Sequence, residues 1–173
     1  GNLNHLNDNK AINEIQKGIL AISQKEEPFD VFICYKESDA NGRRTPDSVL
    51  ATELYHELVR EGFKVCVISG GRGKMLENRL SMLGVTRMYL NCMDKTQAIN
   101  EFIADYGLDA QNMIYMGDDI PDLECMRMVG IPVCPADAAM EVIEASRYVS
   151  EYNGGHGAVR DIVEQVMRAK GCW

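Results

Sequence analysis

The stretch Gly117-Asp118-Asp119-Ile120-Pro121-Asp122 follows an apolar run, Met113–Met116, that predicts a buried β-strand. Three carboxylates therefore fall within a few positions at the end of one strand. Neighbouring like charges repel one another unless a cation neutralises them, and hard oxygen ligands suit Mg²⁺. Pro121 favours the first turn of a following helix. The stretch predicts either a cation site or a helix N-terminus that merely carries acidic residues.

Short apolar runs alternate with helical segments on both sides of this stretch. The predicted strands span residues 31–35, 64–68, 87–91, 113–116, 131–134 and 148–149. The predicted helices span residues 48–61, 74–83, 95–106, 120–128, 136–145 and 158–169. This alternation predicts an α/β fold with a parallel, Rossmann-like sheet between two helical layers. Ligands of such sheets bind at the carboxyl ends of the strands.

Two other strand ends carry polar groups that suit a phosphate. Ser69-Gly70-Gly71-Arg72-Gly73 offers a hydroxyl and accessible backbone N–H groups, although a plain glycine turn has the same composition. Asp94-Lys95 opens a helix, where the ammonium can act as a point charge on a phosphoryl group or be a solvated surface charge. Serine, lysine and aspartates thus follow successive strands in that order.

In this order the residues resemble three motifs of haloacid dehalogenase-type hydrolases, a superfamily that includes phosphatases. About residues 63–173 are most similar to the 3-deoxy-D-manno-octulosonate 8-phosphate phosphatases, which are small and have no cap domain. The matching segments are Val67–Arg72, Glu77–Arg79, Asp94-Lys95, Tyr115–Asp122, Val129–Ile131, Pro135–Ala138 and Gly154–Arg160. The resemblance implies a cap-less haloacid dehalogenase-like fold that binds Mg²⁺ and hydrolyses a phosphorylated sugar acid in lipopolysaccharide biosynthesis. It also implies assembly as a homotetramer.

The resemblance further implies a role for individual residues. Ser69 and Lys95 would be catalytic residues. Asp118, Asp119 and Asp122 would be metal ligands. The implied substrate-binding residues are Gly70, Arg72, Arg79, Gly155 and Arg160.

The first strand departs from that family. The family carries a DxD motif there, in which the first aspartate attacks phosphorus and the second is the general acid and base. Here Lys36 and Ser38 occupy the expected positions. We therefore predict an impaired phosphatase, unless Glu37 or Asp39 substitutes as ligand or weak nucleophile.

The first third of the chain has a different resemblance. Pro28–Asp39 and Ser48–Val65 are similar to the start of a bacterial TIR domain, a family that signals through homotypic association. The two resemblances meet near Gly62–Cys66, which predicts a chimera. The predicted division is a tail with an amphipathic helix, then one α/β domain with TIR-like and phosphatase-like parts (1–27; 28–173, comprising 28–62 and 63–173).

Composition limits the partners. A net charge of −8 argues against nucleic acid, whose phosphates require a basic surface. The sequence has no apolar run of the roughly 20 residues that a membrane span needs. Six cysteines lack CxxC or zinc-like spacing and are predicted to be reduced, which indicates a cytoplasmic protein.

Three functions remain open at this point. The chain is an active Mg²⁺-dependent phosphatase, a catalytically dead scaffold that keeps the metal or phosphate pocket, or a TIR-like interaction module. A carboxylate from residues 37–39 near Asp118 would favour the first, and an ion pair between Lys36 and Asp118 would favour the second. The third would require an exposed self-complementary surface made by residues 9–60.

Overall fold

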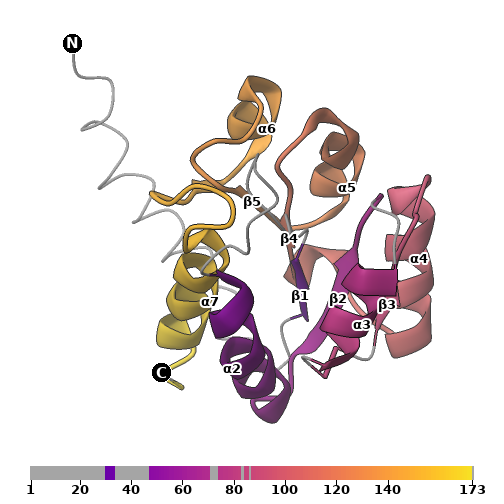
Figure 1. Cartoon of the computed structure of the whole chain (residues 1–173). Coiled ribbons are helices and arrows are strands. Elements are labelled where there is room, and N and C mark those ends of the chain that lie inside the picture. The colour runs from indigo at the N-terminus through magenta and orange to yellow at the C-terminus, as the bar shows by residue number, and fades with distance from the viewer. Residues whose placement is uncertain (1–29, 34–46, 71–73, 83, 86, 173) are drawn as a thin grey trace.

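Six parallel strands form one sheet in the part of the chain that the computed structural model describes, residues 30–33, 47–70, 74–82, 84–85 and 87–172 (Figure 1). The strands are β1 (Asp30–Ile33), β2 (Lys64–Ile68), β3 (Met88–Tyr89), β4 (Met113–Met116), β5 (Ile131–Cys134) and β6 (Tyr148–Val149). Their order is β3-β2-β1-β4-β5-β6. The chain therefore builds the sheet outward from β1 to one edge and then from β4 to the other.

Helices cover both faces of the sheet. The helices are α2 (Asp47–Arg60), α3 (Lys74–Met82), α4 (Lys95–Tyr106), α5 (Leu123–Met128), α6 (Met140–Ala145) and α7 (Ala158–Ala169), with short 3₁₀ turns η1 (Ala110–Asn112) and η2 (Ile120–Asp122). Side chains of α2 and α7 share one buried cluster, and side chains of α4, α5 and α6 share another. The predicted three-layer α/β architecture is confirmed.

Alternation along the strands explains why the two faces have separate cores. Val65 of β2 and Ile114 of β4 pack in the cluster under α2 and α7. Their neighbours Cys66 and Tyr115 pack in the cluster under α4 and α5. Successive strand residues point to opposite faces, so a strand buried on both faces must be apolar throughout. This is why β4 and β2, after its exposed first residue Lys64, have continuous hydrophobic sequences.

The strongest agreement between prediction and structure is at β2, β4, β5, β6, α4 and α7, whose predicted and observed bounds coincide. Helix α6 begins at Met140, four residues later than predicted, because residues 136–139 form a loop. Ala136 N–H donates to the Tyr152 carbonyl there, and Ala139 N–H donates to the Asp118 carbonyl. These bonds hold the loop at the carboxyl end of β4.

Helix α4 shows how the local sequence places a helix N-terminus at the edge of the sheet. The Asp94 carboxylate accepts a hydrogen bond from Gln97 N–H (3.0 Å), which is a standard N-cap interaction. Gly107 ends the helix with φ 64°, in the left-handed region that glycine adopts without strain. Lys95 is consequently the first residue of the helix, after the loop that follows β3.

Two predictions concern residues outside the described ranges or features that the structure does not test. The amphipathic helix expected at residues 9–24 lies outside the described residues. The division of the chain at residues 27 and 62 stays a prediction, although β1 belongs to the same sheet as the later strands and α2 shares a core cluster with α7. None of the helices in the described ranges combines the length and the apolar character that crossing a bilayer requires.

Candidate functional site

The polar residues predicted at strand ends lie together at the carboxyl ends of the parallel strands. They follow β2, β3 and β4, and β4 lies beside β1, where the direction of chain progress across the sheet reverses. Such a switch point is where open parallel sheets bind ligands. The site therefore lies where the topology favours one.

Backbone hydrogen bonds join the segment that begins with Ser69 after β2 to the segment between β3 and Lys95. Ser69 N–H donates to the Tyr89 carbonyl (2.9 Å), and Cys92 N–H donates to the Ser69 carbonyl (3.0 Å). The residue after Ser69, Gly70, lines the same cleft as Lys95. The structure thus places the two predicted phosphate-binding elements next to each other.

Asp122 is the most strongly held carboxylate of the aspartate-rich stretch. Its side chain is 1% exposed, and Oδ1 accepts from Lys95 Nζ (2.6 Å) and from the Tyr115 hydroxyl (2.6 Å). Oδ2 accepts from the backbone N–H groups of Asp118 (3.2 Å) and Asp119 (3.3 Å). A carboxylate has about four lone-pair positions, and these four donors occupy them. Asp122 therefore fixes both Lys95 and the backbone of the motif.

These contacts keep Asp122 ionised. Burial is the largest influence and acts to raise the pKa of Asp122. The hydrogen bonds from Lys95 and Tyr115, together with the Lys95 charge, outweigh burial and hold the pKa below its ordinary value. The buried carboxylate and the ammonium thus form an ion pair inside the site.

The other two aspartates of the motif are placed differently. Asp119 is exposed, and its Oδ1 accepts from Ile120 N–H (2.8 Å), which caps η2. Asp118 is partly exposed, and its carbonyl accepts from Ala139 N–H (3.0 Å). Within the described residues, no three or more His, Cys, Asp or Glu side chains are grouped so that they could hold a metal ion.

The chemistry of the donors still fits a hard divalent cation. Asp118 and Asp119 follow directly after a buried strand, and their carboxylate oxygens could coordinate a cation there. The lone pairs of Asp122 are taken by four donors, and two of these donors are the backbone N–H groups of Asp118 and Asp119, which Asp122 thereby holds in place. The predicted set of three direct ligands stays a prediction, and the geometry gives Asp122 a holding role in addition.

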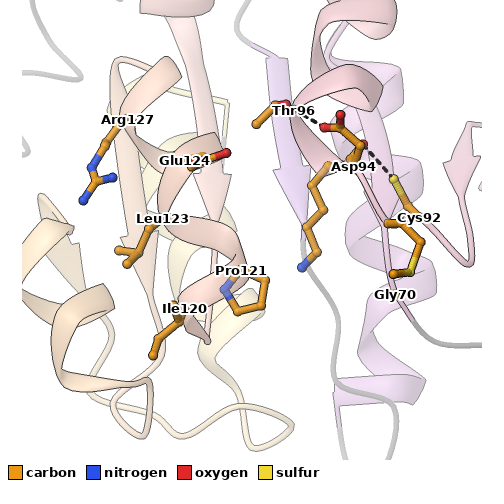
Figure 2. A pocket seen from close by; sticks show the side chains of 11 residues that line it. Gly70, Cys92, Asp94, Thr96, Ile120, Pro121, Leu123, Glu124 and Arg127 are labelled. Carbon is orange, nitrogen blue, oxygen red and sulfur yellow. Dashed lines mark hydrogen bonds between the residues drawn. The ribbon is translucent and has the colours of Figure 1, made fainter.

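A cleft of about 800 Å³ opens beside this ion pair, between the start of α4 and η2–α5. Figure 2 shows Asp94 and Thr96 on one side and Ile120, Glu124 and Arg127 on the other. Lys95, with a side chain that is 16% exposed, lines the cleft and contacts the buried Asp122, which does not line it. A ligand in the cleft would therefore meet the lysine.

The remaining predicted substrate residues lie at varied places. Gly155 is buried with φ 77°, in a loop whose Gly154 N–H donates to Asp137 (2.7 Å) beyond β5. Arg160, in the first turn of α7, is exposed and pairs with Glu164 (2.5 Å). Arg79 belongs to α3. Lys36, Ser38 and Arg72 lie outside the described residues, so their predicted roles stay predictions.

Sequence reasoning did not identify Tyr115 as a residue of the site. It was predicted as part of a buried strand and of the matching segment Tyr115–Asp122, with no role for its hydroxyl, yet that hydroxyl contacts Asp122 directly. A signal was present, because a tyrosine in an otherwise aliphatic strand has a hydroxyl that needs a partner when it is buried. Asn112 and Asp118 are equally near to it along the chain, so the sequence alone does not select Asp122 as that partner.

The cysteines provide a test of the described burial. Cys66, Cys125 and Cys134 are buried, and Cys92 and Cys172 are partly exposed. Burial raises the pKa of Cys92, Cys172 and Cys125, that of Cys125 to about 11, so exposure is what distinguishes Cys92 and Cys172 as targets. Thiolates, not thiols, react with alkylating reagents. We expect iodoacetamide at pH 8 to label Cys92 and Cys172 in the folded protein, and Cys125 only after unfolding. Peptide mass spectrometry measures this, and equal labelling of Cys125 and Cys92 in the folded protein would contradict it.

Comparison with known sequences gives a consistent family. A sequence model of the haloacid dehalogenase-like hydrolases matches residues 76–162, half of the chain. The chain is 34% identical over 113 residues to 3-deoxy-D-manno-octulosonate 8-phosphate phosphatase of Yersinia pestis and 33% identical over 108 residues to that of Escherichia coli K12. These alignments cover 65% and 62% of this chain. The chain spans about 60% of the length of these curated relatives.

Comparison with solved structures extends further along the chain. A haloacid dehalogenase superfamily (subfamily III A) hydrolase of Legionella pneumophila is 25% identical with a TM-score of 0.78, covering 92% of both chains. The octulosonate phosphate phosphatase of Y. pestis is 26% identical with a TM-score of 0.77, covering 90% of this chain and 88% of its own. The cobalt-bound phosphatase of Haemophilus influenzae is 25% identical with a TM-score of 0.72, covering 86% and 92%.

The structural coverage bears on the first third of the chain. The resemblance of residues 10–62 to a TIR domain, and the chimera it suggested, stay predictions without support from these comparisons. Within that stretch, β1 pairs with β4, the strand that precedes the aspartate motif, and Leu54 and Leu58 of α2 pack in the same core cluster as Ile114 of β4. Polar residues follow successive strands in the expected order, Lys95 and Asp122 form an ion pair, and the family model matches half of the chain. The chain therefore belongs to the haloacid dehalogenase-like hydrolase family.

Proposed function

We propose that this chain is a Mg²⁺-dependent phosphomonoester hydrolase that acts on a phosphorylated sugar acid. The observation that carries the proposal is the buried Lys95–Asp122 pair at the switch point of the sheet. Lys95 lines a cleft, and the Asp122 carboxylate accepts hydrogen bonds from the backbone N–H groups of Asp118 and Asp119. The curated relatives are phosphatases of such a substrate, 3-deoxy-D-manno-octulosonate 8-phosphate.

The described residues divide the work of binding a phosphoryl group. Lys95 supplies a positive charge whose position is fixed by Asp122. Gly70, at the end of β2, leaves room for a phosphate oxygen to approach the backbone, and Ser69 adds a hydroxyl. Fixed charges aimed at a transferring phosphoryl group stabilise its transition state.

The proposed cation belongs next to Asp118 and Asp119. When bound, Mg²⁺ would supply Lewis-acid stabilisation of the charge on the phosphoryl oxygens. The relative from H. influenzae was solved in a cobalt-bound form, which supports a divalent cation in this family. The chain's own contribution is to hold the Asp118 and Asp119 backbone through the Asp122 carboxylate.

Turnover is proposed to be impaired, because the sequence has Lys36 and Ser38 where the family has two aspartates. Neither an ammonium nor a serine hydroxyl without a base can replace an attacking carboxylate and a general acid. We therefore expect the chain to bind phosphate but to hydrolyse phosphomonoesters slowly.

The test is an assay of p-nitrophenyl phosphate and octulosonate 8-phosphate hydrolysis, with Mg²⁺ and with EDTA. We expect low wild-type turnover and an increase on the order of 100-fold in the Lys36→Asp, Ser38→Asp double variant, the range that general acid–base catalysis contributes. Asp118→Asn or EDTA should abolish the gained activity. Turnover that is indifferent to Mg²⁺ and to Asp118→Asn would overturn the proposal.

The homotetramer and the cytoplasmic location implied by the resemblance also remain proposals. Sedimentation velocity of the full chain gives the oligomeric state directly. A single species at the mass of one 19.3 kDa chain would contradict the tetramer.

A further inference from the structure

Tyr115 connects the rigid core to the charged centre of the site. It lies in β4, between β1 and β5 in the sheet, and its side chain is completely buried. Its ring belongs to the same core cluster as Ile99 and Phe102 of α4. Its hydroxyl reaches Asp122 Oδ1 at 2.6 Å. A tyrosine ring locked by packing has few ways to move, so its hydroxyl is a fixed point.

Asp122 Oδ1 receives that hydroxyl and the Lys95 ammonium together. Both distances are 2.6 Å, whereas the backbone donors to Oδ2 are longer, at 3.2 and 3.3 Å. The lysine side chain is a flexible stem that does not define a position by itself. The position of the shared oxygen is thus set from the core side by Tyr115, and the ammonium follows the oxygen.

We propose that Tyr115 is a positioning residue that sets the place of the Lys95 ammonium in the phosphate site, acting through Asp122. The inference rests on the proposed phosphate-handling function of this site. Tyr115 does not line the cleft, and its effect on a ligand passes through the carboxylate. The role differs from general support of the fold because it depends on Lys95 being present.

The chain contains a matched tyrosine elsewhere. The Tyr148 hydroxyl donates to Asp161 Oδ2 at 2.7 Å, where it ties β6 to the first turn of α7. Ser150 Oγ donates to the same oxygen at 2.7 Å. Tyr148→Phe therefore removes a tyrosine–carboxylate bond of similar length from the fold without touching the cleft residues.

The experiment measures the affinity for inorganic phosphate in the presence of Mg²⁺, by calorimetric titration of the full chain. We expect Tyr115→Phe to weaken phosphate binding by about tenfold, since small displacements of a fixed charge have effects of this size or larger. Tyr148→Phe should leave the affinity within twofold of the wild type. The thermal midpoint of Tyr148→Phe should fall by about as much as that of Tyr115→Phe. Equal affinities in the wild type and both variants would overturn the inference.

A double-mutant cycle separates positioning from loosening of the fold. If Tyr115 acts through Lys95, then Tyr115→Phe should have no further effect on phosphate affinity in a Lys95→Met background. A further tenfold loss in that background would show a structural role and overturn the inference. If the wild type does not bind phosphate at all, the proposed function fails instead, which is a distinct outcome.

A measurement on the unmodified protein covers the case in which Tyr115→Phe does not fold. A hydroxyl proton donated to a buried carboxylate exchanges slowly and is visible by proton NMR. We expect the Tyr115 signal to shift during phosphate titration and the Tyr148 signal to stay in place. A chemical shift of the Tyr115 hydroxyl proton that stays unchanged at saturating phosphate would overturn the inference.

Discussion

Replacing Lys95 with methionine is expected to lower the free energy of unfolding by about 2–4 kcal/mol, because it leaves a buried carboxylate without its cation. Asp122 is 1% exposed and Lys95 is 16% exposed, so water can replace the ammonium only in part. Methionine keeps most of the volume of the lysine stem, which separates the loss of charge from the loss of packing. Chemical denaturation measures the change.

The second substitution of a cycle identifies the cause. In the Lys95→Met background, Asp122→Asn removes the stranded charge, so it should cost much less than it does alone, with a coupling of about 1–3 kcal/mol. Lys74→Met, at the exposed start of α3, serves as the control and should change stability by at most about 0.5 kcal/mol. Additive losses from Lys95→Met and Asp122→Asn would show that the pair does not matter to the fold.

Gly130→Ala is expected to destabilise the protein by about 3 kcal/mol, at the upper end of what overpacking costs. A Cβ on Gly130 would lie 1.9 Å from the Gln111 carbonyl oxygen, which is a backbone atom that cannot swing away. The Gly130 N–H also donates to the Ala110 carbonyl (2.9 Å), so the two segments cannot separate without losing that bond. A fall of roughly 6–12 °C in the thermal midpoint should follow for a chain of this size.

Gly107→Ala separates the two ways in which a glycine can be required. Gly107 has φ 64°, but nothing lies within 4 Å of its added Cβ. Its substitution should cost about 1 kcal/mol from backbone strain alone. If Gly107→Ala proved more damaging than Gly130→Ala, close contact would not be the dominant requirement at residue 130.

The layered fold was predictable because signals for both strands and helices are explicit in the sequence. β2 and β4 are continuous apolar runs, and α4 is framed by Asp94 and Gly107, residue types that begin and end helices. The order of polar strand ends then placed Ser69, Lys95 and the aspartates at one edge. These are local signals, and they survive in the structure because the tertiary packing agrees with them.

The internal arrangement of the site was less predictable, because it depends on contacts between distant segments. The three aspartates have similar sequence surroundings, yet only Asp122 is buried, and four donors converge on it. The late start of α6 depends on bonds from residues 136 and 139 to segments far away in the chain. Neither feature has a local signature that separates it from the alternatives.

The two outer strands of the described sheet, β3 and β6, have only two residues each. A strand from another molecule that added to either edge would find few backbone partners, so growth of the sheet by edge-to-edge pairing is disfavoured. Contacts between copies of this chain are therefore expected to use side chains on the helical layers. The same short edges protect the chain against the continuous cross-strand stacking that leads to fibrils.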